Sequence, residues 1–149
     1  MSMVKVEASE LVSGQPEAVY ATLADYEVGH PAILPKPTFK SLTVQKGGRG
    51  AGTEFELVME VFGVERTSHQ KVSEPEPGRV LVETGLDINL QTTFTLEPVD
   101  GKTRVTIHTE FETQPGLAGL FEQLVSPPAL RRLYHKELRN LDAYMQKSA

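Results

Sequence analysis

Residues 130–145, LRRLYHKELRNLDAYM, carry the pattern that decides the fold. Apolar side chains recur there every three or four residues, which predicts a long helix with one apolar stripe made of Leu130, Leu133, Tyr134, Leu138, Leu141 and Met145. Ser126 can cap this helix, and Pro127 fits its first turn, where the N–H that proline lacks is not needed. Such a helix is stable in a protein only if its stripe packs against another apolar surface.

That second surface is predicted from residues 39–113, where the pattern changes to strands separated by turns. In residues 53–61, Phe55, Leu57 and Met59 alternate with glutamates, which indicates a strand with one dry and one wet face, as in an antiparallel sheet. Further strands are predicted over residues 39–46, 64–73, 79–84, 89–97 and 102–113. Turns are predicted at Gly63, over residues 74–78 and 98–101, and over residues 47–52, which we expect to form a flexible hairpin loop.

The N-terminal part adds one strand and one or two short helices. Residues 4–12 alternate as a strand, with one face formed by Val4, Val6, Ala8 and Val12. Pro16 begins a helical pattern over residues 16–26, and residues 30–37 form an irregular turn or a second short helix. A further helical pattern precedes Ser126, with Leu117, Leu120, Phe121 and Leu124. We therefore expect an α+β fold in which a seven-stranded antiparallel sheet and the C-terminal helix bury their apolar faces against each other.

Composition excludes several classes of protein. The chain has 149 residues, so we expect a single domain over residues 1–149. The absence of cysteine excludes disulfides, thiolate metal sites and cysteine nucleophiles. A formal charge of −5 argues against nucleic acid or an anionic membrane as the main partner. No stretch approaches the ~20 apolar residues of a membrane span, and the N-terminus lacks the apolar run of a signal peptide, so we expect a cytoplasmic protein.

Five local patterns occur in an order that resembles one superfamily. They are Gln15-Pro16-Glu17-Ala18-Val19-Tyr20 followed by Leu23-Ala24-Asp25, Gly50-Ala51-Gly52-Thr53, Glu74-Pro75 with Gly78-Arg79-Val80, Phe94-Thr95-Leu96-Glu97-Pro98 with Gly101-Lys102-Thr103-Arg104-Val105, and Leu138-Arg139-Asn140-Leu141. Together they resemble the START-like (SRPBCC) superfamily, which includes polyketide cyclase/dehydrase and birch-pollen-allergen proteins. The sequence departs from the family at Tyr20, where tryptophan is common, and over residues 30–35, which lack an aromatic residue.

The resemblance implies a helix-grip fold, in which a curved seven-stranded antiparallel sheet wraps around the long C-terminal helix. It also implies a cavity between sheet and helix that holds an apolar or aromatic small molecule. It does not imply one reaction, because this scaffold serves carriers, cyclases, hydrolases and interaction domains.

Three charged residues fall on faces predicted to point inward. Glu10 shares the face of Val6, Arg66 shares the face of Val72, and Glu137 lies within the apolar arc of the long helix. An arginine between two carboxylates could anchor a carboxylate or enolate of a ligand and leave one glutamate as a general acid or base. The alternative is a structural ion pair, or charged heads that reach water at an open rim.

The remaining candidates are side chains expected to line or border the cavity. Tyr26 and Tyr134 can each pack a ring and offer one hydroxyl, and His30 lies in a loop that would border the cavity mouth. The full predicted ligand-binding set is Tyr26, His30, Phe55, Leu57, Met59, Arg66, Ser68, Gln70, Leu90, Thr92, Phe94, Ile107, Thr109, Phe111, Tyr134 and Glu137. No histidines have the spacing of a metal site, so we expect neither a metal nor another cofactor.

Three functions follow from these features. The first is binding or transport of a hydrophobic small molecule, lipid-like or polyketide-like, by a monomer or homodimer. The second is a cyclase or dehydratase that uses Glu10 or Glu137 as acid or base and Arg66 to stabilise an enolate. The third is an interaction or stress-response module that acts through its acidic outer strand face, which a flat exposed apolar patch would favour.

Overall fold

The computed structural model describes residues 3–112 and 126–148. Its strands are Met3–Val12 (β1), Phe39–Lys46 (β2), Glu54–Val61 (β3), Val64–Glu76 (β4), Val80–Gly85 (β5), Leu90–Val99 (β6) and Lys102–Glu112 (β7). Its helices are Pro16–Ala24 (α1), Gly29–Ile33 (α2) and Pro127–Ser148 (α4). The predicted α+β class, the seven strands and the long C-terminal helix are confirmed.

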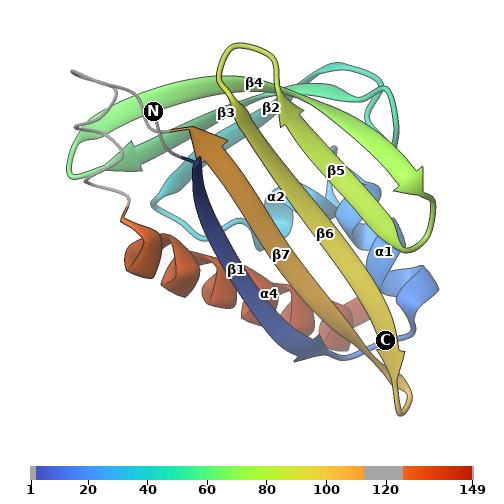
Figure 1. Ribbon diagram of the computed structural model, residues 1–149. Helices are drawn as coiled ribbons and strands as arrows, with labels where there is room; N and C mark the ends of the chain where they lie inside the picture. Colours follow the sequence, from blue (N-terminus) through green and yellow to red (C-terminus); the bar gives the residue numbers. More distant parts are fainter. Residues whose placement is uncertain (1–2, 113–125, 149) are drawn as a thin grey trace.

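The seven strands form one curved antiparallel sheet that closes around α4 (Figure 1). The strand order is β1-β7-β6-β5-β4-β3-β2, so only β1 pairs with a strand distant in sequence, β7. The β2–β3 register shifts between Phe39 and Ser41 and again between Val44 and Lys46, and such bulges bend a strand. Helices α1 and α2 lie at one end of the curved sheet, where α2 contacts α4.

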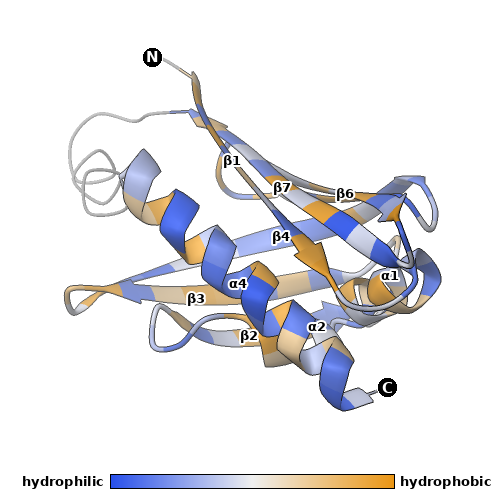
Figure 2. Cartoon of the chain, turned by 90° about the horizontal axis from the view of Figure 1, so that it is seen from below, coloured by the Kyte–Doolittle hydropathy of each residue, from blue (hydrophilic) through white to orange (hydrophobic). Residues whose placement is uncertain are grey.

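Helix α4 buries its predicted apolar stripe against the concave side of the sheet (Figure 2). Leu138 and Leu141 are completely buried, and Leu133 at the edge of the stripe is half-buried. The helix begins as the sequence indicates, since Pro127 occupies its first turn and the Ser126 carbonyl accepts the N–H of Leu130 at 2.8 Å. Helix α4 and the sheet therefore share one continuous hydrophobic core.

Two predicted turns differ from the structure. Strand β4 continues to Glu76, through a register shift between Ser73 and Glu76, and only then turns. The bulge accommodates Pro75, because an unpaired position needs no N–H donor. Residues 47–52, expected to be a flexible loop, are tied to α1 and β4: Gly50 N–H donates to the Ala24 carbonyl at 2.9 Å, and Ala51 N–H donates to Glu74 Oε1 at 2.7 Å.

The predicted short helices are present with altered ends. Helix α1 ends at Ala24 rather than at residue 26, because Asp25 leaves the helical conformation. Of the two alternatives for residues 30–37, the second short helix is found, as α2. The predicted helical pattern from Leu117 to Leu124 lies outside the described residues.

Candidate functional site

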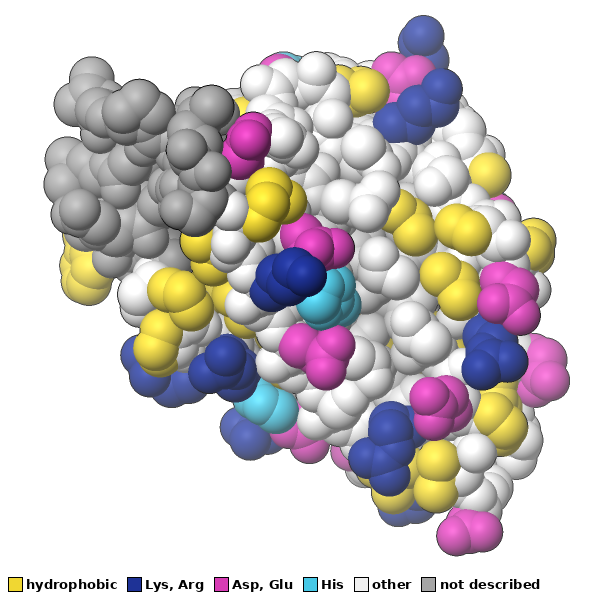
Figure 3. All heavy atoms as spheres, viewed as in Figure 1, with side chains coloured by type: hydrophobic (Ala, Val, Ile, Leu, Met, Phe, Trp, Pro, Cys, Tyr) yellow, Lys and Arg dark blue, Asp and Glu magenta, His cyan; other side chains and the backbone are white. Residues whose placement is uncertain are grey.

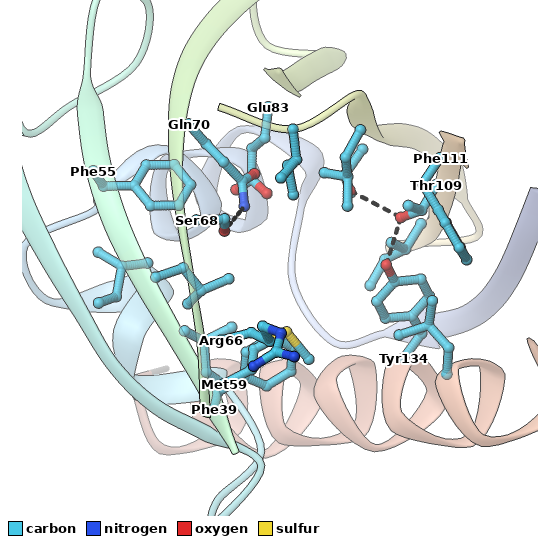
Figure 4. A pocket seen from close by; sticks show the side chains of 18 of the residues that line it. Phe39, Phe55, Met59, Arg66, Ser68, Gln70, Glu83, Thr109, Phe111 and Tyr134 are labelled. Carbon is cyan, nitrogen blue, oxygen red and sulfur yellow. Dashed lines mark hydrogen bonds between the residues drawn. The ribbon is translucent and has the colours of Figure 1, made fainter. Parts of the chain in front are cut away.

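A cavity of about 230 Å³ lies between the concave side of the sheet and α4 (Figure 4). Every residue of the predicted ligand-binding set lines it except Tyr26. Its wall is mostly apolar, with the large side chains Phe39, Phe55, Met59, Phe94 and Phe111. Residues that line it but were not predicted are Leu34, Phe39, Leu42, Thr67, Glu83, Ile88, Asn89, Glu112 and Leu130.

Glu83 of β5 is a buried carboxyl that lines the cavity and has two polar partners. Its Oε2 accepts the hydroxyl of Tyr26 at 2.6 Å and lies 3.4 Å from His30 Nε2. The Tyr26 ring is stacked between His30 and Phe55, with centroid distances of 4.5 and 5.0 Å. Tyr26 is thus completely buried behind the cavity wall, where it supports Glu83 instead of lining the cavity.

His30 lies inside the protein and not at the rim, which corrects the prediction from its loop position. Its side chain is 3% exposed, and its Nδ1 lies 2.8 Å from the carbonyl oxygen of Leu23. Because a carbonyl oxygen only accepts, Nδ1 carries a proton and Nε2 is left to face Glu83. The sequence of residues 30–37 could not give this position, since it depends on how α2 docks against the core.

Glu137 projects from α4 into the same cavity and is buried, as its place in the apolar arc predicted. Within the described part of the chain its carboxyl has no hydrogen-bond partner and no ion pair. Burial raises the pKa of Glu137 well above its ordinary value, and the nearby Glu83 carboxylate raises it further. Burial also raises the pKa of Glu83, but His30 and the Tyr26 hydroxyl oppose this effect. Glu83 therefore has partners that favour its charged form, whereas Glu137 has none within the described part of the chain.

Gln70 of β4 adds an unsatisfied acceptor beside Glu83 (Figure 4). Its Nε2 donates to Ser68 Oγ at 3.1 Å, whereas its Oε1 is buried and has no hydrogen-bond partner. A buried acceptor left unpaired costs free energy, so this oxygen is suited to a donor from a bound molecule.

A chain of three hydroxyls lies on another part of the wall. Thr92 Oγ1 is 2.8 Å from Thr109 Oγ1, which is also hydrogen-bonded to the hydroxyl of Tyr134 on α4 (Figure 4). All three residues were predicted to face the cavity. Burial raises the pKa of Tyr134, so its hydroxyl stays protonated and can donate or accept a hydrogen bond.

The structure does not bring Glu10, Arg66 and Glu137 together. Glu10 lies outside the cavity, where its Oε2 is 2.6 Å from His135 Nδ1 and 3.7 Å from Arg139 Nη2. Its strand face was predicted correctly, but α4 packs directly on the edge strand β1, so the side chain meets the helix. Arg66 lines the exposed end of the cavity, and its Nη1 donates to the Glu65 carbonyl.

Glu83, which the sequence analysis missed, takes the place expected for a second carboxylate. It pairs with Thr92 across the β5–β6 ladder, two residues from the pair of Leu81 and Phe94. Side chains of directly paired residues share a face, so the inward orientation of Thr92 and Phe94 was a signal for Glu83. The signal was missed because β5 has only six residues and they do not alternate clearly between apolar and polar side chains.

The described residues contain no group of three or more His, Asp or Glu side chains arranged to hold a metal ion. Over the same residues, no helix is long and apolar enough to cross a membrane.

Comparison with known families and structures gives a consistent result. The model of the family described as "Polyketide cyclase / dehydrase and lipid transport" matches residues 3–146. The solution structure of the KanY protein (ms6282) is similar with a TM-score of 0.84 and 26% identity, over 98% of this chain and 99% of that one. Comparison with functionally curated proteins gives no match.

Two more distant structures share the fold. The Zhui aromatase/cyclase from Streptomyces sp. R1128 is similar with a TM-score of 0.81 and 18% identity, over 98% of this chain and 95% of that one. The major latex-like protein 151 of Panax ginseng has a TM-score of 0.71 and 9% identity, over 95% of this chain and 97% of that one. At these identities the similarity shows a common helix-grip fold.

Proposed function

The chain belongs to the polyketide cyclase/dehydrase and lipid transport family, and on this basis we propose that it binds a hydrophobic small molecule, lipid-like or polyketide-like, in the cavity between sheet and α4. The observation that carries the proposal is the cavity itself. Its wall is mostly apolar, and among its polar groups are the buried side chains of Glu83, Glu137 and Gln70. Pockets for small molecules have this composition, in which apolar walls supply affinity and a few polar groups fix orientation.

Filling the cavity tests this proposal. Leu90 is a half-buried residue of β6 that lines the cavity, so Leu90→Trp should occupy the space of the ligand. We expect the neutral apolar probe N-phenyl-1-naphthylamine to bind the wild type and to bind Leu90→Trp at least about tenfold more weakly, as measured by fluorescence titration. Leu11→Trp is the matched control, because Leu11 is 42% exposed and lies outside the cavity. Equal affinity of all three proteins would contradict the proposal.

A second candidate is a cyclase or dehydratase, and the pair of cavity carboxyls favours it. Glu137 has no partner that stabilises its charge and suits a general acid, whereas Glu83 has two such partners and suits a general base. Loss of water from a β-hydroxyketone to give an enone tests this chemistry. The enzyme hypothesis expects turnover that both Glu137→Gln and Glu83→Gln abolish, and a wild type without turnover above buffer would count against it.

The third hypothesis, an interaction module, gains no support from the face shown in Figure 3. Acidic and basic side chains are interspersed there. Two ion pairs of exposed or half-buried side chains join β1 to β7, Lys5 with Glu110 and His108 with Glu7. Residence in the cytoplasm and a monomeric or homodimeric state remain predictions.

A further inference from the structure

We propose that the inner end of the cavity selects a ligand with a protonated amine, which the carboxylates of Glu83 and Glu137 hold together with Gln70 Oε1. This inference rests on the proposed binding function and adds a chemical class to it.

Acceptors exceed donors at this end. Glu137 has no hydrogen bond within the described part of the chain, and Gln70 Oε1 is buried without a partner. The nearby donors are already engaged: the Tyr26 hydroxyl donates to Glu83, and Gln70 Nε2 donates to Ser68. His30 Nδ1 is directed at the Leu23 carbonyl. A ligand that supplies hydrogen-bond donors would pair with the acceptor oxygens that the protein leaves unpaired.

The two carboxyls reach the cavity from opposite walls. Glu83 belongs to β5 of the sheet, and Glu137 belongs to α4, which the sheet encloses. The Glu83 charge disfavours ionisation of Glu137, so Glu137 holds its proton until a cation lies near both carboxyls. An ammonium group brings one positive charge and three donors, which match two carboxylates and one amide oxygen.

An anionic ligand head would not suit this end of the cavity. Arg66 is a cationic residue of the lining, and it lies four residues from Gln70 along β4, roughly 13 Å at the rise of a strand. Arg66 is also exposed, whereas Gln70 is buried. Arg66 therefore lies away from the inner end of the cavity, where Gln70 and Glu83 are buried.

Matched ligands test the inference. The probes are 2-naphthylmethylamine, which is protonated at pH 7.5, and 2-naphthylmethanol, which has the same ring and a neutral head. We expect calorimetric titration to show that the wild type binds the amine at least about tenfold more tightly, the size of one charge-assisted hydrogen bond. Glu137→Gln and Glu83→Gln keep the side-chain size and should each reduce this preference severalfold. Glu10→Gln is the control and should keep it, because Glu10 lies outside the cavity.

The outcomes separate this inference from the proposed function. If the wild type binds the alcohol as tightly as the amine, or if both cavity variants keep the preference for the amine, the inference is overturned and hydrophobic binding stands. If neither probe binds, the inference and the proposed function both fail. Circular dichroism of each variant establishes that a lost preference does not come from unfolding.

Discussion

At the scale of single residues, the cavity is distinguished by two buried carboxyls, Glu83 and Glu137, whose charge the surrounding protein stabilises only in part. Glu137 could be placed from the sequence, because helical periodicity assigns each residue of α4 to a face. Glu83 and His30 could not be placed in the same way. The position of Glu83 follows from pairing with a neighbouring strand, and that of His30 follows from the docking of α2. Local patterns contain neither kind of tertiary information.

Glu137→Gln should change how stability depends on pH. The folded protein holds the Glu137 proton more tightly than the unfolded chain does, because the pKa is raised on folding. The free energy of unfolding must then fall as pH rises above about 4.5, the ordinary glutamate value, and continue to fall until the folded-state pKa is passed. The amide cannot ionise, so we expect the variant to be more stable at pH 8 by on the order of 1 kcal/mol, or about 2–4 °C in Tm.

Thermal unfolding between pH 4.5 and 8 measures this difference. Near pH 4.5 the wild type and Glu137→Gln should be similar, since the carboxyl is then protonated in the folded protein and only about half ionised in the unfolded chain. Glu97→Gln makes the same chemical change at an exposed position outside the cavity and should follow the wild type. Parallel curves for the wild type and Glu137→Gln would show that ionisation of Glu137 has no free-energy cost.

Tyr26→Phe should destabilise the protein more than Tyr20→Phe. Both hydroxyls donate to a carboxylate, Tyr26 to Glu83 at 2.6 Å and Tyr20 to Glu74 at 2.7 Å. Only the first hydrogen bond is fully buried, so its loss leaves a buried carboxyl with one donor fewer. We expect a loss of about 2 kcal/mol for Tyr26→Phe and less than about 1 kcal/mol for Tyr20→Phe in urea unfolding. Equal losses would mean that the buried Tyr26–Glu83 hydrogen bond contributes no more to stability than the Tyr20–Glu74 hydrogen bond does.

At the scale of elements, hydrophobic alternation predicted the bounds of strands better than turn-forming residues such as proline did. Strands β2, β3 and β7 begin and end within a residue of their predicted bounds, because alternation between one wet and one dry face leaves little freedom. The end of β4 was missed because a proline-rich segment resembles a turn, whereas here it forms a bulge in a continuing strand. Glu10 shows a related limit: its face was right, but the element that covers this face could not be known from the strand alone.

Because α4 packs against the sheet through one face, substitutions along its apolar stripe should lower the free energy of unfolding by unequal amounts. Leu141 is completely buried and belongs to the core, so Leu141→Ala should cost about 3 kcal/mol in the free energy of unfolding. Leu133 is half-buried on the same helix, and Leu133→Ala should cost about 1 kcal/mol. Urea unfolding of both variants measures the difference. A cost for Leu133→Ala as large as that for Leu141→Ala would contradict the observed face of the helix.

At the scale of the whole molecule, the fold leaves a space where a solid core could have been. The apolar faces of sheet and helix were predictable, and so was the order of elements, because each amphipathic element needs a partner. The volume left between them was not predictable, since it depends on the curvature that bulges and the docking of α2 impose. The central claim is that this space, of about 230 Å³, holds an apolar molecule.

Methionine methyl NMR tests that claim most directly. Met59 lines the cavity, whereas Met145 is buried in the core near the other end of α4 and does not line it. In protein labelled with ¹³C at the methionine methyls, titration with 2-naphthylmethanol should shift the Met59 signal saturably and leave the Met145 signal in place. A Met59 signal that stays unchanged while the ligand demonstrably binds would contradict the account.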